Sequence, residues 1–132
     1  MTDTRLKIKI GTDICSVGRI RKSYERFGER LMQRVLTPAE TAYVTSSRHH
    51  MLERLAGRFA AKEATVKALG VGWRGVGWKE IEVVRLPSGQ PTIKLYGRAL
   101  ALAEKLGLVE FELSMSHERE FATAFVIAYA QI

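Results

Sequence analysis

A glutamate occupies a position where an apolar residue is typical. The stretch GRFAAKEATVKALG, residues 57–70, lies in a helix that we expect over roughly residues 48–69. At ~100° of rotation per residue, Glu63 falls near the middle of an apolar stripe on that helix. The stripe consists of Leu52, Leu55, Ala56, Phe59, Ala60 and Val66. Because an ionised carboxylate facing a core is strongly penalised unless a cation or several donors meet it, the pattern indicates a binding site at Glu63.

A divalent cation would satisfy this charge. Magnesium prefers one or two protein carboxylates and completes its shell with water and substrate phosphate oxygens, so Glu63 needs a second acid. Asp13 is suitable because it follows an expected strand over residues 6–10, where a loop can present it to a cleft. Both acids have ordinary alternatives. Glu63 can pair with Lys67 at i+4, and Asp13 taken alone is more commonly an Asx-turn or a helix-entry cap.

Three further side chains are candidates for a functional site, and none is distinctive alone. Lys62 and Lys67 flank Glu63 at the edges of the stripe, where solvated lysines are usual. His117 ends SMSH, residues 114–117, whose alternate serines are typical of a solvated strand face. The four glycines in GVGWRGVGW, residues 70–78, predict an irregular loop, but their spacing matches no phosphate-binding fingerprint.

Composition restricts the classes of protein to which the chain can belong. The net charge of +7 favours an anionic partner without choosing between nucleic acid, a polyphosphate cofactor and an acidic protein. Much of the positive charge lies in residues 18–34, which predicts a local basic face. Cys15 is the only cysteine, which excludes an intramolecular disulfide and fits a cytoplasmic setting. Neither a membrane span nor a signal peptide is evident.

Hydrophobic periodicity predicts the elements that position these residues. Leu6, Ile8 and Ile10 alternate with lysines in a strand that we expect to end at Gly11. Further strands are expected at 81–84, 91–96, 109–117 and 121–130, and helices at 16–27, from residue 38, at 48–69 and at 97–106. Thr37 and Glu40 form a capping box at the second of these helices. Residues 1–132 therefore predict one α+β domain.

The last expected strand is apolar on both faces. Phe121, Phe125 and Ile127 alternate with Ala122 and Val126. Such a strand is either central in its sheet or covered by another subunit.

The motifs together resemble a known family. GTDI at residues 11–14, FAAKEATVKA at 59–68 and SMSH occur in the order found in the holo-[acyl-carrier-protein] synthases, the small trimeric class of phosphopantetheinyl transferases. RVLTPAE, residues 34–40, is also similar to that family's segment before the central helix. The resemblance spans nearly the whole chain. It implies one phosphopantetheinyl transferase domain over residues 1–132, with a long central helix packed on a small, mainly antiparallel sheet.

The resemblance also assigns roles to the candidate residues. Asp13 and Glu63 match the magnesium ligands beside the coenzyme A pyrophosphate. Lys62 and Lys67 match lysines that neutralise phosphate charge, so the implied catalytic residues are Glu63 and Lys67. His117 matches a histidine that contacts the cofactor.

One segment departs from the family pattern. SSRHHM, residues 46–51, replaces a stretch in which Lys or Arg often grips the ribose phosphate. We expect Arg48 or Arg54 to serve instead, and Arg58 is a further candidate for cofactor binding.

The implied reaction is magnesium-dependent transfer of phosphopantetheine from coenzyme A to a serine of apo-acyl carrier protein, leaving adenosine 3',5'-bisphosphate. Glu63 or a water on the metal is expected to accept the serine proton.

Carrier proteins are strongly acidic, so a basic docking helix is expected. Its residues are Arg19, Arg21, Lys22 and Arg26. The resemblance further implies a homotrimer with shared active sites, and we expect Ala124 and Val126 in the contact between subunits.

Two other functions compete with this interpretation. A small basic nucleic-acid-binding module would stack bases on Trp73 and Trp78 beside Arg74. That function does not require Glu63 on an apolar stripe. A non-catalytic trimeric scaffold would bind no ligand.

Overall fold

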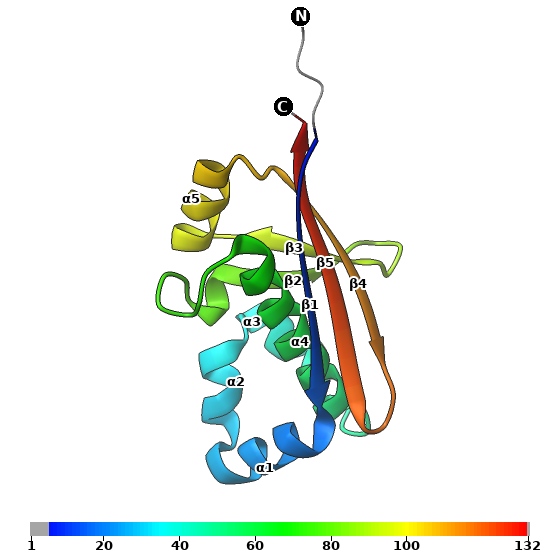
Figure 1. The fold of residues 1–132 in the computed structure, drawn as a ribbon. Helices are drawn as coiled ribbons and strands as arrows, with labels where there is room; N and C mark the ends of the chain where they lie inside the picture. The colour runs from blue at the N-terminus through cyan, green and yellow to red at the C-terminus, as the bar shows by residue number, and fades with distance from the viewer. Residues whose placement is uncertain (1–5, 132) are drawn as a thin grey trace, which may run out of the picture.

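A computed structural model describes residues 6–131, and these residues place helices on one side of a long, narrow sheet (Figure 1). The elements are β1 (Leu6–Ser16), α1 (Val17–Phe27), α2 (Glu29–Val35), α3 (Pro38–Thr45), α4 (Met51–Leu69), the short 3₁₀ helix η1 (Trp78–Glu80), β2 (Ile81–Arg85), β3 (Pro91–Leu95), α5 (Gly97–Leu106), β4 (Glu110–His117) and β5 (Phe121–Gln131). An antiparallel sheet has the order β1-β5-β4, and β2 and β3 form a separate hairpin. The α+β class predicted from sequence is confirmed.

Helix α4 packs closely on the sheet because both surfaces carry small residues. Ala60, Ala64 and Ala68 of α4 lie in one cluster with Ala124 and Val126 of β5. Gly11 of β1 is part of this close approach, since a Cβ there would lie 1.8 Å from the Ala64 carbonyl oxygen. Gly11 therefore does not end the strand as expected. It lets β1 pass α4 and continue to Ser16.

The other face of the sheet carries large apolar side chains in solvent. Ile10 and Ile14 of β1 are 60% and 64% exposed, and Phe125 of β5 is 42% exposed. The predicted two-faced apolar strand is thus present. Ala124 and Val126, however, are buried on the face toward α4. The expectation that they form a contact between subunits is wrong, because the small residues of β5 pack inward and the large ones point outward.

Local signals explain most helix ends. The Thr37–Glu40 capping box is present at α3, and Gly70 ends α4 with a left-handed φ of 76°. Helix α2 has no counterpart among the sequence predictions, because seven residues are too few for a clear period. Within residues 6–131, no helix is long and apolar enough to cross a membrane.

Candidate active site

Asp13 and Glu63 line the same pocket of about 270 Å³. Asp13 comes from β1 and Glu63 from α4, and the wall between them includes Cys15, Arg19 and Phe59. Asp13 reaches the pocket because β1 continues beyond Gly11. Gly11 lies against the backbone of α4, so the residues that follow it in β1 stay beside that helix. Two acids that lie 50 residues apart in sequence thereby share one site.

Lys67 contributes a cation at this site. Its ammonium lies 3.1 Å from Asp13 Oδ1 and also donates to the carbonyl oxygen of Thr12 at 2.9 Å. Lys67 therefore pairs with Asp13, whereas Glu63 Oε1 accepts a hydrogen bond from the indole Nε1 of Trp73 at 3.1 Å. The i+4 pair of Glu63 with Lys67, considered from sequence, is not the arrangement observed.

The donor set of the pocket fits magnesium better than a transition metal. Two carboxylates in an open pocket match the few protein ligands that magnesium takes beside a phosphate substrate. Burial, reinforced by the nearby charge of Asp13, raises the pKa of Cys15 to about 11. The thiol is therefore neutral at pH 7 in the metal-free pocket. Across residues 6–131, no group of three or more His, Cys, Asp and Glu is arranged to hold a metal ion.

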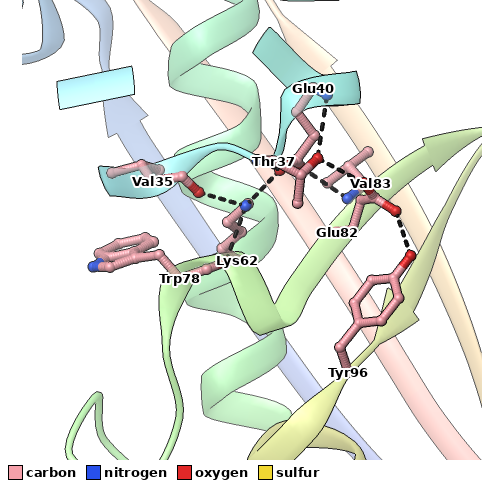
Figure 2. Close-up of polar contacts among 8 residues, drawn as sticks. All are labelled: Val35, Thr37, Glu40, Lys62, Trp78, Glu82, Val83 and Tyr96. Atoms are coloured by element: carbon pink, nitrogen blue, oxygen red, sulfur yellow. Dashed lines mark hydrogen bonds and ion pairs between the residues drawn. The ribbon is translucent and has the colours of Figure 1, made fainter. Parts of the chain in front are cut away.

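Lys62 lies in the core, away from the phosphate role expected for it (Figure 2). Its ammonium donates to the Val35 carbonyl oxygen at 2.6 Å, to Glu40 Oε1 at 2.7 Å and to the Trp78 carbonyl oxygen at 3.0 Å. Three partners use all three donors of an ammonium group. Burial lowers the pKa of Lys62, and the Glu40 carboxylate opposes that shift. The expectations of a solvated side chain and of a phosphate contact are both wrong.

Glu40, the acidic partner of Lys62, connects three elements of the fold. Its carboxylate accepts the backbone N–H of Thr37 and that of Val83, each at 2.9 Å (Figure 2). The start of α3, the middle of α4 and the β2 strand are therefore held together by one fully buried carboxylate. Because Glu63 follows Lys62 in α4, this contact fixes the rotation that brings Glu63 to the pocket. Sequence reasoning found the capping role of Glu40 but not this second one.

A second pocket, of about 160 Å³, contains a cluster of arginines. The guanidinium carbons of Arg54, Arg58 and Arg85 lie 4.3, 4.3 and 4.6 Å from the ring centroid of Tyr43. Arg58 is buried, burial lowers its pKa, and its Nε has no hydrogen-bond partner among the described residues. Converging guanidinium groups with an unused buried donor suit a bound anion.

His117 lines the same arginine pocket. Its Nδ1 lies 3.4 Å from Glu53 Oε2. The pocket thus brings together three of the predicted cofactor residues: Arg54, Arg58 and His117. Arg85 was missed because it lies on a separate hairpin with no local motif.

The remaining predicted basic residues are exposed. Arg48 lies outside the arginine pocket, in a hollow that it shares with Arg21 and Arg119. On α1, the spacing of three and four residues places Arg19, Lys22 and Arg26 on one side of the helix. Arg19 also lines the pocket of Asp13 and Glu63. The basic side of α1 therefore borders the acidic pocket.

Paired acids beside a lysine in one pocket, and a cluster of arginines in another, are side chains that suit the binding of phosphate groups. The sequence profile of the 4'-phosphopantetheinyl transferase superfamily matches residues 9–130. The holo-[acyl-carrier-protein] synthase of Gloeobacter violaceus is 52% identical over 118 residues, covering 89% of each chain. The chain therefore belongs to the 4'-phosphopantetheinyl transferase superfamily, which confirms the resemblance and the enzyme class predicted from sequence.

Solved structures of relatives agree with this assignment. The holo-[acyl-carrier-protein] synthase of Neisseria meningitidis is 40% identical, with a TM-score of 0.82 over 91% of this chain and 96% of the other. That of Helicobacter pylori, solved in complex with coenzyme A, is 32% identical, with a TM-score of 0.79 over 90% of this chain and 98% of the other. The predicted architecture of a long helix on a small antiparallel sheet is thus confirmed.

Proposed function

We propose that the chain transfers phosphopantetheine from coenzyme A to a serine of apo-acyl carrier protein in a magnesium-dependent reaction, releasing adenosine 3',5'-bisphosphate. The observation that carries this proposal is the shared pocket of Asp13 and Glu63, with Lys67 3.1 Å from Asp13. The complex of the Helicobacter pylori relative supports coenzyme A as the donor. We further propose that the reaction takes place in the cytoplasm.

The residues of the pocket divide the chemistry between them. The serine oxygen bonds to the β-phosphorus of coenzyme A, the bond from that phosphorus to the leaving bisphosphate breaks, and Glu63 accepts the serine proton. Asp13 and Glu63 would hold magnesium, which when bound offsets the negative charge of the pyrophosphate. Lys67, beside Asp13, adds a positive charge that stabilises the phosphate oxygens as the leaving group departs.

The arginine pocket supports a site for the ribose phosphate of coenzyme A. Arg58 offers a buried Nε without a partner among the described residues, and Arg54 and Arg85 add two more guanidinium groups. His117 lines this pocket and is assigned to the same phosphate. In this proposal Arg58 and Arg54 bind the ribose phosphate, a role that sequence reasoning gave to Arg48 or Arg54.

Product analysis tests the proposed reaction. The chain, coenzyme A and apo-carrier are incubated with magnesium or with a chelator, and adenosine 3',5'-bisphosphate is separated and quantified. We expect one equivalent of bisphosphate for each carrier modified, and none with the chelator. Release that continues unchanged in the chelator would contradict the magnesium role.

The acidic carrier is proposed to dock on the basic side of α1. Reversing Arg19 and Arg26 to Glu should raise the apparent KM for the carrier by about tenfold, since charge complementarity mainly sets the rate of encounter. The salt dependence of the rate should weaken. Steady-state kinetics at several salt concentrations measure both effects. Lys105→Glu, an exposed charge reversal on α5, is the control and should leave both constants near wild type. An equal change in the KM for coenzyme A would place α1 in the nucleotide site instead.

We also propose a homotrimer with shared active sites, formed through the outer face of β1 and β5. Phe125→Glu should dissociate the assembly and abolish activity, because it places a charge among the exposed apolar side chains of that face. Leu100→Glu on α5 is matched in exposure, at 43% against 42%, and should keep the assembly. Sedimentation coupled to activity measures the result. A fully active monomer would contradict the shared sites.

The nucleic-acid alternative is weakened by the two tryptophans. The rings of Trp73 and Trp78 stack on each other with centroids 3.7 Å apart. Each ring therefore covers one face of the other, and a nucleic-acid base cannot stack on that face. Thermal unfolding distinguishes the alternatives. We expect coenzyme A with magnesium to raise the unfolding temperature more than a single-stranded oligonucleotide does, and a non-catalytic scaffold would respond to neither.

A further inference from the structure

Trp73 touches the carboxylate at the centre of the candidate site. It lies in the glycine-rich loop, residues 70–77, which connects α4 to η1. Its indole Nε1 donates to Glu63 Oε1 at 3.1 Å. An indole can only donate, and a donor is held more strongly by a charged acceptor than by a neutral one. The contact therefore favours a single orientation of the Glu63 carboxylate.

The position of Trp73 is fixed by aromatic packing. Its ring stacks on Trp78 at an interplanar angle of 20°, and Trp78 lies 5.0 Å, centroid to centroid, from Phe59. Phe59 lines the pocket that contains Glu63. The indole N–H is thus held by a stack that continues into the wall of the site.

Two adjacent residues of α4 contact this loop and the residue that follows it. The ammonium of Lys62 donates to the carbonyl oxygen of Trp78 just beyond the loop (Figure 2), and Glu63 accepts from Trp73 in the middle of the loop. The loop is consequently tied to the same turn of α4 that carries the acid. A short chain segment with these two anchors keeps the indole in register with the carboxylate.

We propose that Trp73 is a positioning residue for Glu63. Its N–H takes one lone pair of Oε1, which leaves Oε2 and the second lone pair of Oε1 for the metal and the serine proton. A carboxylate held in one orientation before substrate binds reaches the reactive geometry more often than one that samples several rotamers. This inference rests on the proposed role of Glu63 in phosphopantetheine transfer.

Matched tryptophan-to-phenylalanine variants test the hydrogen bond separately from the stack. Trp73→Phe keeps an aromatic ring on Trp78 but removes the donor to Glu63. We expect kcat to fall about tenfold, the scale of losing one hydrogen bond to a charged group, with the KM for coenzyme A and for the carrier close to wild type. Trp78→Phe makes the same chemical change on the other ring of the stack and should keep kcat near wild type. Thermal unfolding checks that both variants fold.

Nuclear magnetic resonance gives a readout that does not depend on turnover. The chain contains two tryptophans, so ¹⁵N-labelled protein should give two indole N–H signals, and Trp73→Phe identifies one of them. Glu63→Gln should shift the Trp73 signal more than the Trp78 signal, because the acceptor loses its charge.

The outcomes separate the inference from the proposed function. Full turnover by Trp73→Phe, with Glu63→Gln inactive, would overturn the inference and leave the proposed function standing. Equal losses of kcat in Trp73→Phe and Trp78→Phe would also overturn it, because packing alone would then explain the effect. If wild-type protein transfers nothing, the proposed function fails, and the indole signals still decide whether Trp73 holds Glu63.

Discussion

Glu63→Gln is expected to abolish phosphopantetheine transfer while leaving the fold intact. The amide keeps the volume of the side chain but loses the charge that would bind magnesium and the basicity that would accept the serine proton. Removing one group that stabilises charge in a transition state typically costs about 10²–10³-fold in kcat. Because Glu63 has two proposed roles, we expect a loss at or beyond the upper end of that range, measured by steady-state transfer to apo-carrier.

The same change should leave the stability of the apo protein close to wild type. Glu63 is partly buried, so neutralising it removes the cost of desolvating a charge, whereas the hydrogen bond from Trp73 becomes weaker because its acceptor is then neutral. Glu104→Gln, at an exposed position of α5, is the matched control and should retain wild-type turnover. Turnover near the wild-type rate at saturating magnesium would disprove the metal assignment of Glu63.

Lys62→Met is expected to have the largest effect on stability. The Lys62 and Glu40 side chains are both fully buried, so removing the ammonium leaves the carboxylate without its cation and two carbonyl oxygens without a donor. Breaking a buried ion pair by removing one partner costs about 3–5 kcal/mol. A domain with a total stability of about 5–15 kcal/mol would lose a large part of it. Denaturant unfolding measures the loss.

Two companion variants identify its cause. Lys105→Met makes the same change at an exposed position of α5 and should alter the free energy of unfolding by no more than about 0.5 kcal/mol. The double variant Lys62→Met with Glu40→Gln should be less destabilised than the sum of the two single variants, because neither charge is then left alone. Additive losses would show that the pair is not energetically coupled.

The fold was predictable where local rules decide it. The capping box of Thr37 and the expected ends of the helices now labelled α4 and α5, at residues 69 and 106, match the structure. Gly11 was misread because a glycine after an alternating stretch also suits a strand end. Its actual role depends on α4, 53 residues away at Ala64, and a single sequence does not contain that proximity.

The same limit applies to the candidate site. The placement of Asp13 and Glu63 followed from the helix period and the family resemblance, whereas the helix period put Lys62 at the edge of the stripe. Lys62 is instead among the most buried residues, because Glu40 and two carbonyl oxygens from other elements meet its charge. Trp73 was considered for stacking, but its bond to Glu63 depends on how the glycine-rich loop folds back.

The intact mass of the carrier protein tests the central claim most directly. Apo-carrier is incubated with coenzyme A and magnesium in the presence of wild-type protein, Glu63→Gln or Asp13→Asn, and each carrier sample is weighed by mass spectrometry. Our proposal predicts that wild-type protein adds the mass of one phosphopantetheine group to the carrier and that neither variant does so at the same enzyme concentration. A carrier left unmodified by wild-type protein, or modified equally well by all three proteins, would contradict the assignment of this pocket as the site of transfer.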